Sequence, residues 1–171
     1  MSRGRPPAWN AFAQLDTSAW IEVAAFDAKG RLSVPVAVRR RLSWFGTPNG
    51  RLLLADLSPE GYAELSPWIP NGEAKVTAIE DVASHIDREQ RSMLLLGAMD
   101  RFLQVSVEAG GRLNIPTNLR AHLAPDSDEV VRVVVRENRL WLWGERGWRE
   151  TRRTRLRVVN TIFAPTEPPI A

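Results

Sequence analysis

Two stretches of the chain, residues 26–42 and 107–123, share one order of apolar and polar positions. After a polar turn, polar and apolar residues alternate, as around Leu32 and Val34 in the first stretch, and this alternation predicts a half-buried β-strand. A proline follows, and then apolar residues four positions apart, which predicts a short helix with one apolar edge. Six residues of the first stretch return unchanged 81 positions later: Gly30, Arg31, Leu32, Pro35, Arg39 and Leu42.

A tight turn is expected before each of these strands. In the first stretch, Asp27 is followed by two spacer residues and Gly30, and Glu108 and Gly111 take the same places in the second. Glycine adopts the positive φ that such a turn needs, and the acidic residue can orient the arginine that follows it. The chain therefore predicts two equivalent turn–strand–helix units.

Further strands are predicted from alternation over residues 19–26 and from apolar runs. Residues 51–55 form one such run, and a second lies at 130–135, joined by a tight turn to a strand at 139–143. Aligning the run at 51–54 with 139–142 makes the first repeat about seven residues shorter than the second. We therefore expect the first repeat to have lost or shortened one strand.

Three helices are predicted outside the repeated units. Residues 58–65 begin with a serine that can cap a short helix and a proline suited to its first turn. A longer helix, broken by charged residues 87–91, is expected to link the repeats from about residue 73 or 78 to about 96. Residues 144–160 carry six arginines and predict a basic helix near the C-terminus.

Composition narrows the function classes. The net charge is only +3, but 21 of the 23 basic residues are arginine. Arginine suits bidentate contacts to phosphate and guanine, although arginine-rich composition also follows from genome base content. There are no cysteines, which excludes disulfides, thiolate metal sites and cysteine nucleophiles.

An enzyme is not expected. The sequence has no Gly-rich phosphate loop and no histidine pair, its two histidines read as surface residues, and its acidic residues are scattered. We predict no catalytic residue, no metal, no cofactor and no small-molecule substrate. No run of eighteen apolar residues and no hydrophobic signal segment are present, so we expect a cytoplasmic protein without a membrane contact.

The repeated motif is an acidic residue, two spacers, Gly-Arg, apolar-x-apolar-Pro, and then an apolar residue followed by arginine. It resembles the AbrB-like (SpoVT-AbrB) DNA-binding domain. Two copies in one chain, with the sequence of residues 138–143 after the second, more narrowly resemble the MraZ family of transcriptional regulators. The resemblance covers roughly residues 21–148.

Each repeat alone offers too few strands to bury both faces, so the two halves must combine. The resemblance implies a mainly β fold with short helices (α+β), arranged as a pseudo-two-fold, swapped-hairpin, double-psi-like β-barrel. We expect an N-terminal arm (1–18), a first AbrB-like repeat (19–66), a helical linker (67–101), a second AbrB-like repeat (102–149) and a basic C-terminal helix and tail (150–171). Family likeness also implies a homo-oligomeric ring.

The resemblance implies double-stranded DNA as the partner and a nucleoid-associated location. The positions that carry over as DNA-binding are Lys29, Arg31, Arg39, Arg40, Arg112 and Arg120. The turn-orienting positions are Asp27, Gly30, Glu108 and Gly111. The second repeat is less basic, since Gly110 and Ala121 replace Lys29 and Arg40.

Other interpretations of the same residues are possible. In one, the arginine after each turn glycine forms an ion pair with the preceding acidic residue and does not contact DNA. The chain can instead be an antitoxin-like or protein-interaction module of AbrB fold, or a degenerate MraZ-like protein without DNA recognition. The basic C-terminal segment can lie along DNA, bind an acidic partner or simply face solvent.

Overall fold

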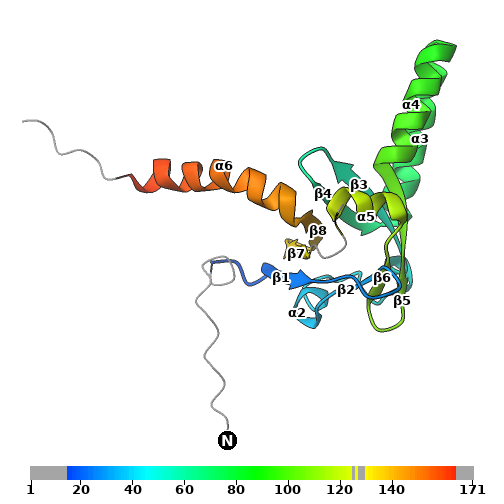
Figure 1. Cartoon of the computed structure of the whole chain (residues 1–171). Coiled ribbons are helices and arrows are strands. Elements are labelled where there is room, and N and C mark those ends of the chain that lie inside the picture. Colours follow the sequence, from blue (N-terminus) through cyan, green and yellow to red (C-terminus); the bar gives the residue numbers. More distant parts are fainter. Residues whose placement is uncertain (1–14, 125, 127–129, 165–171) are drawn as a thin grey trace, which may run out of the picture.

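The computed structural model describes residues 15–124, 126 and 130–164. Residues 1–14 of the predicted arm (1–18) and residues 165–171 of the predicted C-terminal helix and tail (150–171) lie outside the described residues. The fold is α+β and is built on one antiparallel sheet with eight strands (Figure 1). Its strands are β1 (Trp20–Ala24), β2 (Arg31–Ser33), β3 (Leu52–Ser58), β4 (Tyr62–Pro67), β5 (Phe102–Glu108), β6 (Arg112–Asn114), β7 (Val131–Arg136) and β8 (Arg139–Gly144).

The sheet curls into a nearly closed barrel. Its strand order is β1-β7-β8-β4-β3-β5-β6-β2, so β1 and β2 are its two edges. A single bridge between Phe26, just beyond β1, and Leu32 in β2 joins these edges. The bridge brings the two edges of the sheet together at this point.

The two halves of the chain contribute the same series of elements. The first half runs β1, β2, α2 (Val36–Arg39), β3 and β4, and the second runs β5, β6, α5 (Thr117–Leu123), β7 and β8. Strands of the two halves pair directly: β1 with β7, β2 with β6, β3 with β5 and β4 with β8. The barrel is thus assembled from both halves together.

The first half has not lost a strand, and the helix predicted over residues 58–65 is wrong. Residues 59–61 form a turn, in which Gly61 has a φ of +87°, and β4 follows. Ala63 and Leu65 are buried while their neighbours are not, which is strand periodicity. The apolar run in β3 therefore corresponds to β7, and not to β8 as the sequence alignment indicated.

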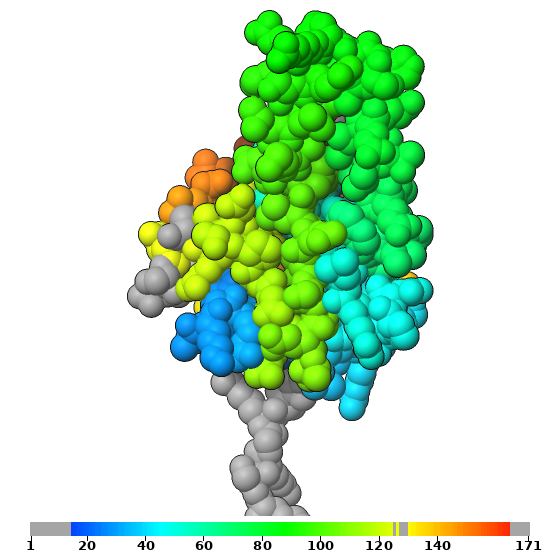
Figure 2. Space-filling model, turned by 90° about the vertical axis from the view of Figure 1, so that its right-hand side faces the viewer, coloured from blue at the N-terminus to red at the C-terminus, as the bar shows by residue number. Residues whose placement is uncertain are grey.

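The linker contains two helices where one broken helix was predicted. A short helical segment, η2 (Trp68–Gly72), leads into α3 (Glu73–Ser84), and α4 (Arg88–Arg101) returns beside it. Asp87 begins the second helix, because its side chain accepts a hydrogen bond from Gln90 N at 2.9 Å and caps α4. The α3–α4 hairpin stands clear of the barrel (Figures 1 and 2).

The predicted basic helix is present as α6 (Glu145–Phe163), which continues directly from β8 and extends away from the barrel (Figure 1). One further helical turn, η1 (Pro48–Gly50), lies in the connection between α2 and β3. The two long helical arms, α3–α4 and α6, therefore leave the barrel in different directions.

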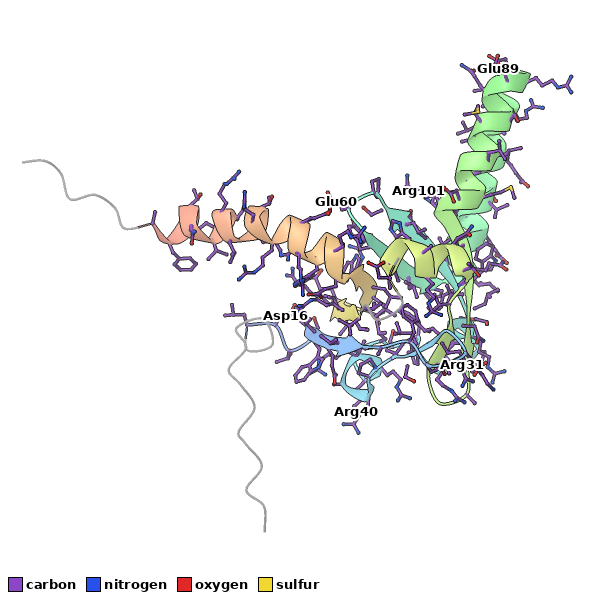
Figure 3. All side chains as sticks on the ribbon, viewed as in Figure 1. Asp16, Arg31, Arg40, Glu60, Glu89 and Arg101 are labelled. Carbon is purple, nitrogen blue, oxygen red and sulfur yellow. The ribbon has the colours of Figure 1, made fainter. Side chains whose placement is uncertain are left out.

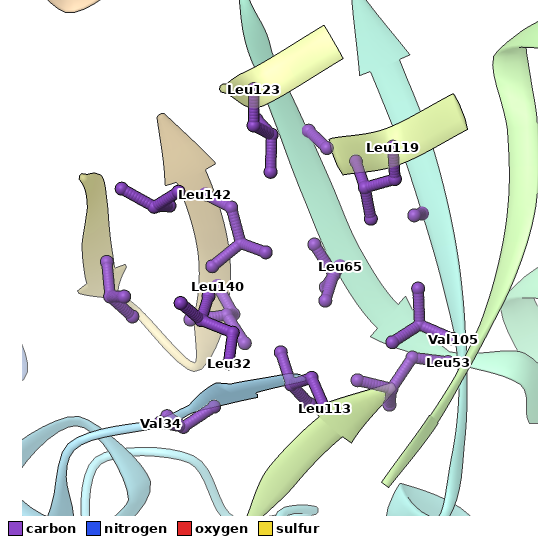
Figure 4. Packing of buried hydrophobic residues seen from close by; sticks show 14 of the residues in the cluster. Leu32, Val34, Leu53, Leu65, Val105, Leu113, Leu119, Leu123, Leu140 and Leu142 are labelled. Carbon is purple, nitrogen blue, oxygen red and sulfur yellow. The ribbon is translucent and has the colours of Figure 1, made fainter. Parts of the chain in front are cut away.

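The barrel interior is a continuous apolar core supplied by both halves. Leu32 and Leu113 face each other across the β2–β6 pair, and both are fully buried (Figure 4). Val38 and Leu42, the apolar edge predicted after Pro35, are also buried. Among the described residues, every buried side chain of the core is hydrophobic. Packing of the repeated leucines thus fixes the two Gly-Arg turns relative to each other.

Candidate nucleic-acid interface

The two Gly-Arg turns lie side by side, because the strands that follow them, β2 and β6, pair with each other. Arg31 is opposite Asn114, and Ser33 is opposite Arg112. Leu32 and Leu113 between them point into the core, so the polar side chains on either side project from the outer face of this two-stranded ribbon. Both turn arginines therefore belong to one surface of the barrel, at the lower edge where Figure 3 labels Arg31.

The first turn is held closed by Asp27. One carboxylate oxygen accepts hydrogen bonds from the backbone N–H groups of Lys29, at 2.8 Å, and Arg31, at 2.9 Å. The other accepts Arg31 Nε at 2.8 Å. The backbone hydrogen bond from Arg31, followed by its side-chain hydrogen bond, lowers the pKa of Asp27. Gly30 has a φ of +74°, as the turn requires.

Glu108, the acidic residue of the second turn, contacts both turn arginines. Its Oε2 lies 3.1 Å from Arg31 Nη1 and 3.7 Å from Arg112 Nε. Hydrogen bonding and charge attraction to Asp27, with a smaller contribution from Glu108, raise the pKa of Arg31. Arg31 thus forms the ion pair that sequence analysis left as an alternative, and its side chain is 20% exposed, against 44% for Arg112.

The helix arginines of the repeated motif cross to the opposite repeat. Arg39 in α2 covers the second turn: its Nη1 donates to Gly110 O at 3.1 Å, and a Cβ on Gly111 would lie 2.7 Å from its Cδ. Arg120 in α5 covers the first turn, where its Cζ lies 4.9 Å from the centre of the Phe26 ring. A Cβ on Gly30 would lie 3.2 Å from Arg120 Nη1. Each of these arginines packs on a turn of the other half.

Lys29 and Arg40 are exposed, and no acidic partner of either side chain occurs among the described residues. Arg40 projects from the end of α2 (Figure 3) and lines a hollow between α2 and the second turn. Arg51, which sequence analysis assigned only to a strand, lines the same hollow and is exposed. The sequence gives no sign that Arg51 lines this hollow, since a single arginine before an apolar run is common. Only the folded connection after α2 brings Arg51 to the second turn.

In the part of the chain that the structure describes, no group of three or more His, Asp or Glu side chains is placed to hold a metal ion. Within the same residues, no helix is long and apolar enough to cross a membrane. The two histidines lie apart: His85 ends α3, and His122 Nε2 contacts Tyr62 O at 3.1 Å.

Comparison with protein families finds a match. The model of one family, described as "MraZ protein, putative antitoxin-like", matches residues 100–157. Residues 100–157 are therefore similar to the MraZ family, and the match covers less than half of the chain. The match runs from the end of α4 through β5, β6, α5, β7 and β8 into α6, so it contains the second Gly-Arg turn and its helix arginine. No curated protein matches the chain. The resemblance to the MraZ family is therefore confirmed over the second repeated unit.

Proposed function

We propose that this protein is a transcriptional regulator that binds double-stranded DNA in a sequence-specific manner through the β2–β6 ribbon and its two turns. The observation that carries the proposal is the direct pairing of the two strands that follow the Gly-Arg turns. This pairing brings the two turns, each followed by an arginine, onto one surface, which supports their contact with a single duplex. The MraZ match over the second unit supports the same function.

The basic residues of the site have three different roles in this proposal. Lys29, Arg40 and Arg112 are exposed and neutralise backbone phosphates, which supplies most of the affinity. Arg31 is balanced by Asp27 and Glu108, so it contributes contacts to the groove with little net charge. Arg39 and Arg120 support the turns from behind. Base edges are then read by the few turn residues that enter a groove.

The finer architecture is part of the proposal. The pairing of strands between the halves is what a swapped-hairpin, double-psi-like barrel requires. The two AbrB-like repeats span residues 19–66 and 102–149, with a linker at 67–101. We further propose that several copies assemble into a ring at the nucleoid in the cytoplasm. Avidity over repeated DNA elements would then compensate for weak single contacts.

Gel-shift titration with DNA from upstream of the protein's own gene tests the proposal, at about 50 mM and about 200 mM salt. The affinity should fall steeply with salt, because bound arginines release counterions from the duplex. Replacing both turn arginines, Arg31→Ala with Arg112→Ala, should weaken binding by roughly tenfold or more.

Arg88→Ala is the matched control, because Arg88 is an exposed arginine at the far tip of the α3–α4 hairpin. It should leave binding unchanged. If the double variant shifts DNA as well as the parent protein does, the turn arginines do not contact DNA. If the parent protein shifts no DNA at all, the degenerate, non-binding alternative holds.

An antitoxin-like role is the second candidate, favoured by the family description and by α6. The outer part of this helix exposes Leu156, Val159 and Phe163 beside arginines, which suits a protein partner with apolar and acidic surface. Co-expression with the product of an adjacent gene separates the two. A stable complex that requires Phe163 and leaves DNA unbound would favour the antitoxin-like role.

A further inference from the structure

A hollow in the surface lies between α2, the connection that follows it and the second Gly-Arg turn. Its volume is about 740 Å³, which is within the range of pockets that hold small ligands or parts of larger ones. The basic residues that line it are Arg39, Arg40 and Arg51, and the acidic residue is Glu108. The hollow is therefore bounded on one side by the second Gly-Arg turn and extends the proposed DNA-binding surface as far as Arg51.

Positive charge in this hollow is not balanced by the protein. Glu108 already contacts Arg31 and Arg112, while Arg40 and Arg51 are exposed and, among the described residues, have no acidic partner. Arg39 Nε is buried without an acceptor from the described residues, which leaves one more N–H unsatisfied beside the hollow. Guanidinium groups collected in this way favour an anion with several acceptor oxygens.

The backbone fixes Arg51 next to the second turn. Its carbonyl oxygen accepts a hydrogen bond from Val107 N at 2.8 Å, in the strand that leads into that turn. Gly50, just before it, is buried and packs on Trp44, where a Cβ would lie 2.0 Å from the Trp44 carbonyl oxygen. The side chain of Arg51 therefore starts from a firmly placed main chain, as a binding residue needs.

The other half of the barrel lacks these charges. Ala121 stands at the position of Arg40, and Val130 precedes β7 as Arg51 precedes β3. Arg40 and Arg51 therefore have no basic counterparts at these two positions of the second half. A symmetric ribbon would bind a duplex equally well in two orientations, whereas this charge difference favours one of them.

We propose that the hollow binds a backbone phosphate of the same duplex and so fixes the direction in which the protein lies on DNA, with Arg40 and Arg51 as the binding residues. This inference rests on the proposed DNA-binding function and extends it to Arg51. A phosphate group is held by charge-assisted hydrogen bonds, and no covalent step is involved. Because a phosphate carries no sequence information, the contact positions the protein and adds affinity for any duplex.

Salt titration of DNA binding by fluorescence anisotropy tests the proposal, with the upstream duplex and a scrambled duplex of equal length. The double variant Arg40→Ala with Arg51→Ala should have a log–log salt slope shallower by about two, one for each phosphate-binding arginine. Its affinity should fall by the same factor for both duplexes. The single variant Arg51→Gln should change the slope by about one, and Arg88→Ala should match the parent protein.

Three results would overturn the inference. If the parent protein binds DNA and the double variant keeps the parental slope with an unchanged melting temperature, the hollow does not bind the backbone, although the proposed function stands. If the parent protein binds neither duplex, the proposed function and the inference fail together. The third result comes from a titration with inorganic phosphate alone. If phosphate binds saturably, if this binding requires Arg51, and if added phosphate leaves the affinity for the duplex unchanged, the hollow binds free phosphate and not the DNA backbone.

Discussion

Two separate features of the second turn require glycine at position 111. Gly111 has a φ of +79°, which side chains with a Cβ rarely adopt, and Arg39 from the other half lies directly against it. The same arrangement recurs less tightly at Gly30 and Arg120. At the scale of single residues, each turn is therefore shaped by its own glycine and by an arginine of the opposite half.

Gly111→Ala should destabilise the protein by roughly 1–3 kcal/mol, because alanine is strained at this φ and displaces the Arg39 side chain. Gly97→Ala is the matched control, since Gly97 lies inside α4 with open space where its Cβ would be. That change should raise stability by about 0.5–1 kcal/mol. Urea denaturation of both variants measures the difference, and equal effects on stability would contradict the assigned role of Gly111.

At the scale of elements, α6 is attached to the barrel through its first part, and most side chains of its outer part are exposed among the described residues. Glu145 accepts Arg132 Nε from β7 at 2.9 Å and Arg149 Nε from the next turn of the helix at 3.0 Å. Arg155 lies over Trp148, with its Cζ 4.1 Å from the ring centre, and burial lowers its pKa. Arg132 and Arg155 thus hold the helix in place, and the outer arginines of α6 remain for a partner.

Loss of the Glu145 carboxylate should weaken this attachment in a pH-dependent way. Hydrogen bonding from Arg132, with that from Arg149, lowers the pKa of Glu145 from its ordinary value of 4.5. The stabilisation is therefore fully present above pH 4.5 and is lost as the pH falls through the lower pKa of the folded state. Glu145→Gln should cost about 1 kcal/mol at pH 7 and should make the decline in stability below pH 4.5 shallower.

Glu150→Gln removes the same charge from an exposed position of α6 and should change stability very little. Urea midpoints measured from pH 3 to pH 7 compare the two variants. A Glu145→Gln protein whose pH profile runs parallel to that of the parent protein would show that the ion pair with Arg132 does not stabilise the fold.

The repeated elements were readable from the sequence because their signals are local. A turn glycine, alternation over four residues and a proline are enough to predict β2, β6 and the helices after them. The helix predicted over residues 58–65 failed since its local cap signal competes with distant pairing: Tyr62 is opposite Trp143, and Ala63 is opposite Leu142. Tertiary pairing outweighed local propensity there.

The candidate site could be predicted only in part, because some of its residues are brought together by tertiary structure and not by local sequence signals. The repeat indicated Arg31 and Arg112, and the structure brings them together through the β2–β6 pair. The crossing of Arg39 and Arg120 to the opposite turns depends on how the halves interleave, which spacing along the chain does not encode. Arg51 depends on the folded connection after α2 and had no counterpart in the second unit to reveal it.

At the scale of the whole molecule, two halves with the same series of elements form a barrel whose proposed DNA-binding surface carries unequal charge. The ribbon is nearly symmetric, but three exposed cations without an acidic partner among the described residues all come from the first half: Lys29, Arg40 and Arg51. The α3–α4 hairpin and α6 leave the barrel elsewhere and carry their own basic and apolar side chains (Figures 1 and 3). The central claim is thus that DNA binds at the paired turns and not along the helical arms.

Backbone amide chemical shifts measured by NMR during titration with the upstream duplex test this claim most directly. The account predicts that amides of residues 27–31 and 108–112 shift together with one midpoint, while those at the tip of the α3–α4 hairpin stay in place. Shifts confined to α6, or shifts at one turn without the other, would contradict it.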